Sequence, residues 1–124
     1  MTKIPKNIRL KWLSLPRLAT SFIAFHVANP RVYRELARLA VQMRGTGRMR
    51  YSIGTLYEVL RWHRDLETTD AVFKLCNNHR AFYARLIMSR EPTCHALFCL
   101  KRQKACPVPF YRILEVLDAI EGAA

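Results

Sequence analysis

Acidic side chains are scarce in this sequence. Its 124 residues include nine Asp or Glu against 21 Lys or Arg, which gives a formal net charge of +12 and a pI of about 10.2. The few acids are also scattered, and the closest pair, Asp65 and Glu67, stands two residues apart. A metal-dependent nuclease needs carboxylates gathered around its ions. The sequence therefore argues against this class of enzyme.

Other features of an active site are missing as well. Gly45 and Gly47 are not followed by the residues that complete a phosphate-binding loop. No nucleophile can be matched to a general base from the sequence. We therefore expect a non-enzymatic protein, with no catalytic residues and no cofactor.

Long apolar runs are absent. A membrane span needs about 20 apolar residues, and the longest apolar segment, 18–28, is much shorter and is followed by Pro30. It also lacks the small-residue cleavage pattern of a signal peptide. We expect a cytoplasmic protein that does not enter a membrane, and in that compartment the four cysteines are reduced thiols or metal ligands rather than disulfides.

The spacing of the cysteine and histidine residues resembles that of a metal site but does not match it. A tetrahedral zinc site could use four residues of the C-terminal half: Cys76, His79, Cys94 and Cys99. Cys94 and Cys99 stand five apart, which is no standard knuckle, and free cysteine often serves as a small buried hydrophobe. The sequence favours free thiols, and we expect no metal ligand.

Positive charge is concentrated in the N-terminal half. Residues 1–50 contain eleven Lys or Arg and one acid, Glu35, whereas residues 109–124 contain one Arg against three acids. Cationic side chains gathered in this way repel one another, so an anionic partner is the natural explanation for their presence. We expect that partner to meet the N-terminal half, and the last helix to be a structural cover.

The chain has the length and composition of one globular domain. Hydrophobic residues make up 51% and charged residues 24%. We interpret residues 1–13 as a basic, irregular N-terminal arm and residues 14–124 as a single helical domain. Ser14 is expected to cap the first helix, with Pro16 in its first turn.

The next helix has the clearest pattern. Asn29 and Pro30 predict its start, and Gly45 its end in a left-handed cap. One side is apolar (Val32, Leu36, Leu39, Ala40 and Met43) and another is basic (Arg31, Arg34 and Arg38). Glu35 stands four residues after Arg31, so we also expect these two to form a surface ion pair.

Four further helices follow in the prediction. Ser52 caps a helix that ends at Trp62, and Asn77 caps another with Phe82, Tyr83, Leu86 and Ile87 inside. A short helix runs from Pro92 to Leu100. Pro107 and Pro109 introduce the last helix, with Phe110, Ile113, Leu114 and Leu117 inside. Residues 71–76 are compatible with either a short strand or a helical turn.

These elements predict a mainly α fold, a compact multi-helix domain. The succession of helix, basic turn, helix, turn and helix between Pro30 and Arg90 is typical of a helix-turn-helix or winged-helix-like core. Many helical bundles share this succession. Proteins of this kind often bind as dimers on two half-sites, so a homodimer is possible.

The basic residues are the main candidate site, because Arg guanidinium groups bind phosphates bidentately. We predict phosphate contacts from Lys6, Arg9, Lys11, Arg31, Arg34, Arg38, Arg48 and Arg50. We predict base or groove contacts from Asn78, Arg80 and Arg85, at the start of the helix capped by Asn77. Nucleic acid, with DNA favoured, is the predicted partner, and an acidic protein surface is the alternative.

Aromatic side chains offer a further way to bind unpaired bases. The candidates are Tyr33, Tyr51, Trp62, Phe82 and Tyr83. Their helical spacing is more typical of core residues than of a stacking surface.

Several short motifs lie between Phe22 and Gln103. They are Phe25-His26-x-x-Asn29-Pro30-x-Val32-Tyr33, Leu60-Arg61-Trp62, Phe73-Lys74, Asn77-Asn78, Tyr83-Ala84-Arg85 and Pro92. Together they resemble a group of small proteins encoded by tailed phages and bacterial prophages. The resemblance implies a phage product in a bacterial cytoplasm, but it assigns no functional residue. In that context the two hypotheses are a phage DNA-binding protein and a phage inhibitor or adaptor that binds a host machine, such as a defence complex or polymerase.

Overall fold

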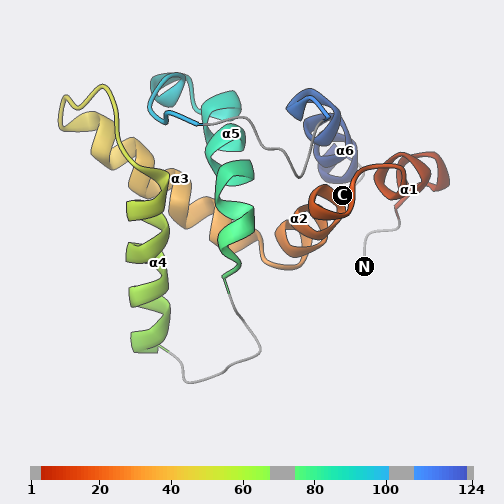
Figure 1. Ribbon diagram of the computed structural model, residues 1–124, viewed down its shortest axis with the longest axis horizontal. Coiled ribbons are helices and arrows are strands. Elements are labelled where there is room, and N and C mark those ends of the chain that lie inside the picture. Colours follow the sequence, from red (N-terminus) through yellow and green to blue (C-terminus); the bar gives the residue numbers. More distant parts are fainter. Residues whose placement is uncertain (1–3, 68–74, 101–107, 123–124) are drawn as a thin grey trace. The chain divides into compact units, whose positions relative to one another are not determined.

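The computed structural model describes residues 4–67, 75–100 and 108–122, and it is mainly α-helical, as predicted. Figure 1 shows its six α-helices. They are α1 (Lys6–Leu13), α2 (Arg17–Ala28), α3 (Pro30–Gly45), α4 (Ile53–Glu67), α5 (Arg80–Arg90) and α6 (Phe110–Gly122), with the 3-10 turns η1 (Asn77–His79) and η2 (Pro92–Cys94). None of these helices is long and apolar enough to cross a membrane.

The chain divides into two compact units. Residues 1–28 and 102–124 form the first unit, and residues 29–101 form the second. The predicted boundary after residue 13 does not coincide with this division, because residues 14–28 belong to the same unit as α1. Each unit has its own buried residues.

In the first unit, α2 and α6 bury one side each. The spacing of three or four residues on both helices places their apolar side chains on one face. The buried residues are Ala19, Phe22, Ile23 and His26 of α2, and Ile113, Val116, Leu117 and Ile120 of α6. The His26 ring stacks on Phe22 with centroids 5.9 Å apart, and its Nε2 lies 3.2 Å from Glu121 Oε1. This contact connects α2 to the end of α6.

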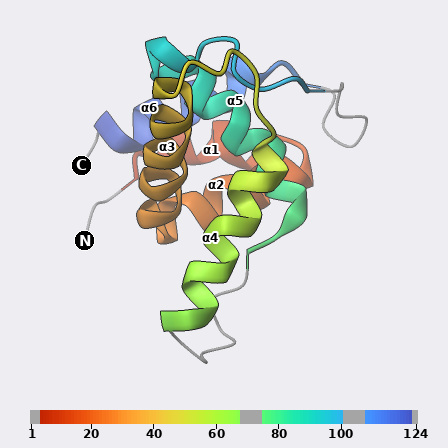
Figure 2. The same cartoon turned by 90° about the vertical axis from the view of Figure 1, so that its left-hand side faces the viewer.

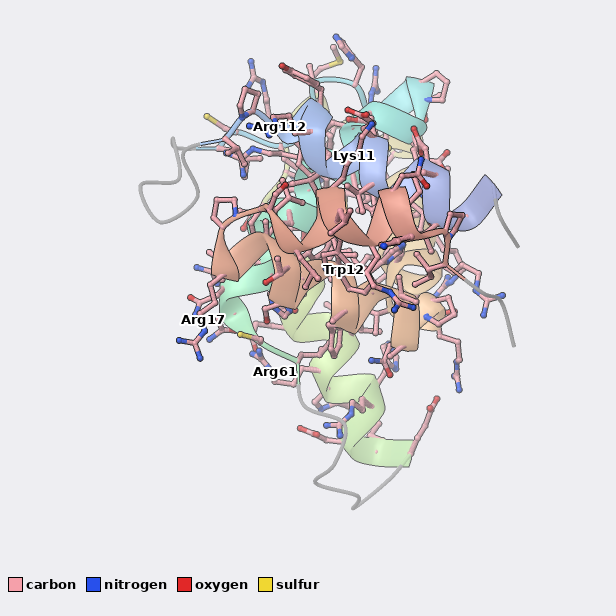
Figure 3. The ribbon with its side chains drawn as sticks, turned by 90° about the vertical axis from the view of Figure 1, so that its right-hand side faces the viewer. Lys11, Trp12, Arg17, Arg61 and Arg112 are labelled. Atoms are coloured by element: carbon pink, nitrogen blue, oxygen red, sulfur yellow. The ribbon has the colours of Figure 1, made fainter. Side chains whose placement is uncertain are left out.

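The prediction of an irregular N-terminal arm is wrong for residues 6–13, which form α1. Lys11 Nζ donates to Glu115 Oε1 of α6 at 2.6 Å, and Trp12 Nε1 donates to the Thr20 carbonyl of α2 at 3.3 Å. Figure 3 shows these two side chains reaching towards different neighbours of α1. A basic, weakly apolar sequence therefore becomes a helix here because α2 and α6 supply partners for it.

Ser14 has a different role from the predicted one. Its hydroxyl donates to the Lys11 carbonyl at 2.7 Å, so it lies at the end of α1. The next helix begins only at Arg17, after Pro16. The Ser-Leu-Pro segment thus separates two helices instead of beginning one.

In the second unit, α3, α4 and α5 pack against one another. Figure 2 shows the same three helices from the side. Tyr57 of α4 and Tyr83 of α5 are both fully buried, with ring centroids 6.5 Å apart. Burial raises the pKa of both hydroxyls, which keeps them neutral. The Tyr57 hydroxyl donates to the Cys76 carbonyl at 2.8 Å, which holds the chain just before η1 against α4.

Two of the predicted helix starts are confirmed. Asn29 occupies the N-cap position of α3 with Pro30 at the first helical position. Ser52 Oγ accepts from the Thr55 amide at 3.3 Å at the start of α4. The predicted left-handed position is wrong by two residues, because Gly45 is still helical and Gly47 has the positive φ of 95°.

Other boundaries also differ from the prediction. α4 does not end at Trp62 but continues to Glu67. Asn77 lies inside η1, and α5 begins at Arg80. The helix expected from Pro92 to Leu100 consists of η2 alone.

A single β contact is present in the described part of the chain. Tyr51 and Phe98 form an isolated parallel bridge, in which the Tyr51 amide donates to the Leu97 carbonyl at 2.9 Å. It is not a strand pair, so the described residues include no wing. Residues 71–74, for which a strand or helical turn was predicted, lie outside the described residues.

Candidate nucleic-acid interface

α3 has two chemically different sides. Its buried residues are Val32, Leu36, Ala37 and Ala40. Its exposed residues include Arg31, Arg34, Arg38, Val41 and Gln42. At 3.6 residues per turn these two sets lie on opposite sides of the helix. The packing of α3 on α4 and α5 therefore directs its arginines away from the core of the second unit.

The three arginines of this side differ in their partners. Arg38 donates to Glu35 Oε2 through Nε at 3.3 Å and Nη2 at 3.2 Å. The predicted pair of Arg31 with Glu35 is therefore not the one formed, and Arg31 Nη2 instead lies 4.0 Å from Glu67 Oε2 of α4. Arg34 forms no hydrogen bond or ion pair among the described residues. Its guanidinium group is available to an external anion.

More cations follow at the end of α3. Arg48 and Arg50 are exposed in the loop between α3 and α4. Neither forms an ion pair with a described residue. We group these exposed arginines of α3 and of the loop that follows it, and call them the α3 surface: Arg31, Arg34, Arg38, Arg48 and Arg50.

The predicted contacts of the first unit are less uniform. Lys6 and Arg9 are exposed on α1. Lys11 is engaged by Glu115, and both its hydrogen bond and its charge lower the pKa of the Glu115 carboxyl. Arg17 and Arg112 are also exposed on this unit (Figure 3). Lys11 thus has a structural role as the partner of Glu115, and its phosphate contact stays a prediction.

The predicted base-reading residues lie around the start of α5. Asn78 and Arg80 are exposed, whereas Arg85 is half-buried and donates to the Ala81 carbonyl of its own helix at 3.3 Å. Five of the 11 residues of α5 are buried: Phe82, Tyr83, Ala84, Leu86 and Ile87. These five residues occupy more than half of the helix circumference. α5 therefore has no continuous exposed face that could lie in a groove.

Not every arginine of the second unit belongs to its surface. Arg61 Nη2 donates to Asn77 Oδ1 at 2.6 Å and to the Leu75 carbonyl at 3.4 Å, and its guanidinium lies 5.6 Å from the Tyr57 ring centre. Glu58 also accepts from it. Arg61 therefore joins α4 to the segment that leads into α5, and it is unsuited to bind an external phosphate.

Aromatic stacking has little support among the candidates. Phe82 and Tyr83 are buried, and Tyr33 and Tyr51 are half-buried. Trp62 is 61% exposed on α4. A single exposed ring offers a much smaller platform than proteins that bind single strands use.

The four residues considered for zinc do not form a cluster. Cys94 and His79 are buried, Cys76 is half-buried and Cys99 is exposed. Within residues 4–67, 75–100 and 108–122, no three His, Cys, Asp or Glu side chains lie close enough together to hold a metal ion. Cys94 packs as a small core residue.

Sequence reasoning missed two members of the exposed side of α3. Val41 is 41% exposed and Gln42 is exposed. They stand three and four residues after Arg38, the spacing that places residues on one helical face. The periodicity that identifies the arginines also identifies Val41 and Gln42, but these neutral side chains give no charge signal in the sequence.

Comparisons with known proteins provide no relative from which a function could be transferred. No family model matches the chain, and no curated protein or solved structure matches it significantly.

Proposed function

We propose that this protein binds nucleic acid, most readily DNA, without catalysing a reaction, and that the α3 surface is its main contact. The observation that carries the proposal is the row formed by Arg31, Arg34 and Arg38, exposed opposite the buried side of α3. Guanidinium groups in such a row suit the phosphates of a nucleic-acid backbone. Glu35 is the one acid within α3, and it is held by Arg38.

The three helices α3, α4 and α5 are the proposed helix-turn-helix-like core. Its connections are longer than the turn of three or four residues found in that motif. Residues 46–52 join α3 to α4, and residues 68–79 join α4 to α5. We therefore propose a three-helix binding core that presents α3. The same proposal includes a homodimer, because helix-turn-helix proteins often bind two half-sites. It also includes a phage product in the bacterial cytoplasm, which follows from the resemblance of the motifs.

The proposal is tested by the salt dependence of binding. Fluorescence anisotropy would measure the affinity of the full chain for a short mixed-sequence duplex over a series of salt concentrations. We expect micromolar or tighter binding that weakens steeply as salt rises, since each phosphate contact contributes about 0.9 to the slope of log K against log salt. Little binding even at low salt would overturn the proposal.

Two double variants identify the surface. Arg34→Ala with Arg38→Ala should lower the slope by about two. Arg17→Ala with Arg112→Ala removes the same charge from exposed positions of the first unit, and it should change the slope much less. Equal effects of the two variants would mean that binding follows net charge and not the α3 surface.

An acidic protein surface is the second candidate partner, as for an inhibitor or adaptor of a host machine. One observation favours it: Trp62 and Leu66, 61% and 67% exposed, stand four residues apart on one side of α4. Exposed Trp is typical of the anchor residues of protein interfaces. If this is the function, the protein should bind DNA weakly, and Trp62→Ala should abolish its binding to a protein partner.

A further inference from the structure

The exposed side of α3 changes character along the helix. Its N-terminal part is formed by Arg31, Arg34 and Arg38, whereas its C-terminal part is formed by Val41, Gln42 and Gly45. These last three residues are exposed and uncharged. No heavy atom would lie within 4 Å of a Cβ added to Gly45, so the end of this side is open.

This neutral patch has cations on both sides along the chain. Arg34 and Arg38 precede it on the same helical face, and Arg48 and Arg50 follow it in the loop. In a duplex groove, the base edges lie between two rows of phosphates, one row on each strand. The neutral patch and its flanking arginines follow the same order along the chain. A small neutral patch between cations allows close approach to base edges, while the longer arginines reach outward to the backbones.

The side-chain types of the patch match base edges of the major groove. A glutamine amide can pair with adenine N6 and N7, and an apolar side chain such as valine can contact the thymine methyl group. The groove is about 12 Å wide and admits an α-helix. The 16 residues of α3 are long enough to enter it, at about 1.5 Å of rise per residue.

We infer that the target is double-stranded DNA and that the C-terminal half of α3 enters the major groove, where Gln42 and Val41 contact base edges. This inference rests on the proposed binding of nucleic acid and adds the class of target and the reading residues. Arg34 and Arg38 then contact one backbone, and Arg48 and Arg50 the other. α3 takes the role that the sequence suggested for the start of α5.

The same surface is poorly suited to the other nucleic acids. Single strands are bound by aromatic side chains placed among cations. None lies on the exposed side of α3, because Tyr33, the one aromatic residue of this helix, is half-buried, with Arg90 Cζ 5.8 Å from its ring centre. Duplex RNA has a major groove too narrow for side chains to read. The chemistry of the patch therefore selects duplex DNA.

The first experiment compares three targets of one sequence: duplex DNA, the single strand and duplex RNA. Competition against a labelled duplex, with the full chain, should show at least about tenfold tighter binding to duplex DNA, because only its major groove admits the helix. Equal or tighter binding to either of the other two would overturn this inference and leave the proposed function standing. Absence of binding to all three would overturn both.

The second experiment tests the reading residue. Selection from a random duplex library would be performed with the parent, with Gln42→Ala and with Thr55→Ala, an exposed change on α4. Gln42→Ala should lose discrimination at one base pair by roughly 5- to 150-fold, the range for one bidentate contact, and keep the salt slope. Thr55→Ala should select like the parent. An unchanged selection by Gln42→Ala would overturn the assignment of Gln42, and thermal melting by circular dichroism would show that the variants are folded.

Discussion

α3 and α5 are neighbours in the second unit, yet they serve it in different ways. α3 buries four of its 16 residues on one side and exposes arginines on the other. α5 buries five of its 11 residues around more than half of its circumference. Polar residues at a helix start suggested that α5 would meet the partner. The comparison shows that α3 has a continuous outward face, which the proposed function requires of a binding helix, whereas α5 has none.

The largest expected effect on stability follows from a substitution in the buried part of α5. Leu86 is fully buried in α5, and Leu86→Ala should lower the free energy of unfolding by about 2–5 kcal/mol through lost burial and a cavity. Urea denaturation would measure it. Ser89→Ala, a change of an exposed residue of the same helix, should alter stability by less than about 0.5 kcal/mol. Equal effects of the two changes would show that α5 is not the core helix.

Substitutions on the buried side of α3 should reduce stability as much as substitutions in the core of α5, whereas substitutions on its exposed side should not. Leu36 is fully buried, so Leu36→Ala should also cost about 2–5 kcal/mol. Arg34→Ala should stay within about 0.5 kcal/mol, because Arg34 has no bonded partner among the described residues. Denaturation curves for both variants would check this, and a large loss for Arg34→Ala would contradict the assignment of its side chain to the surface.

Arg61 separates structural from binding arginines. Arg61→Met keeps much of the side-chain length but removes the hydrogen bonds to Asn77 and the Leu75 carbonyl, so it should cost about 1–3 kcal/mol of stability. Its effect on the salt slope of DNA binding should be negligible. A lowered slope with unchanged stability would place Arg61 in the interface instead.

A direct test of α3 against α5 uses the polar start of α5. Asn78→Ala with Arg80→Ala removes the two exposed candidates there. If α3 carries the contact, the salt slope should change by less than about 0.5, against about two for the Arg34 and Arg38 double variant. Anisotropy under the same conditions gives both values. The reverse ranking would return the reading role to α5.

The smallest effect concerns pH and the buried His79, which precedes α5. Burial lowers the pKa of His79 from its usual value of 6.5. The unfolded chain then binds a proton at a higher pH than the folded chain, so the contribution of His79 to stability is complete above pH 6.5 and is lost as pH falls below it. Urea denaturation at pH 7.5 and at pH 5.5 should show this loss, and His79→Leu should reduce the difference. His95→Gln, a change of an exposed residue, is the control and should leave the difference as it is.

Local patterns predicted those parts of the fold that depend on adjacent residues. Asn29-Pro30 and Ser52 begin helices because capping and proline geometry act within one turn. Periodicity identified Leu36 and Arg34 as opposite sides of α3. The same kind of reasoning placed the end of α4 too early and treated α1 as irregular. Those boundaries depend on contacts with distant residues, such as Lys11 with Glu115, that no local pattern contains.

The sequence by itself determined the helical class, the net charge and the two-sided pattern of α3, because composition and periodicity are properties of the chain alone. Only the tertiary structure decided which arginines face outward and which are used internally. Arg34 and Arg61 have the same side chain, but one lies on the free side of α3 and the other bonds to Asn77, 16 residues away. The packing of α3, α4 and α5 made this distinction, since a cation becomes structural or available according to the neighbours that folding brings to it.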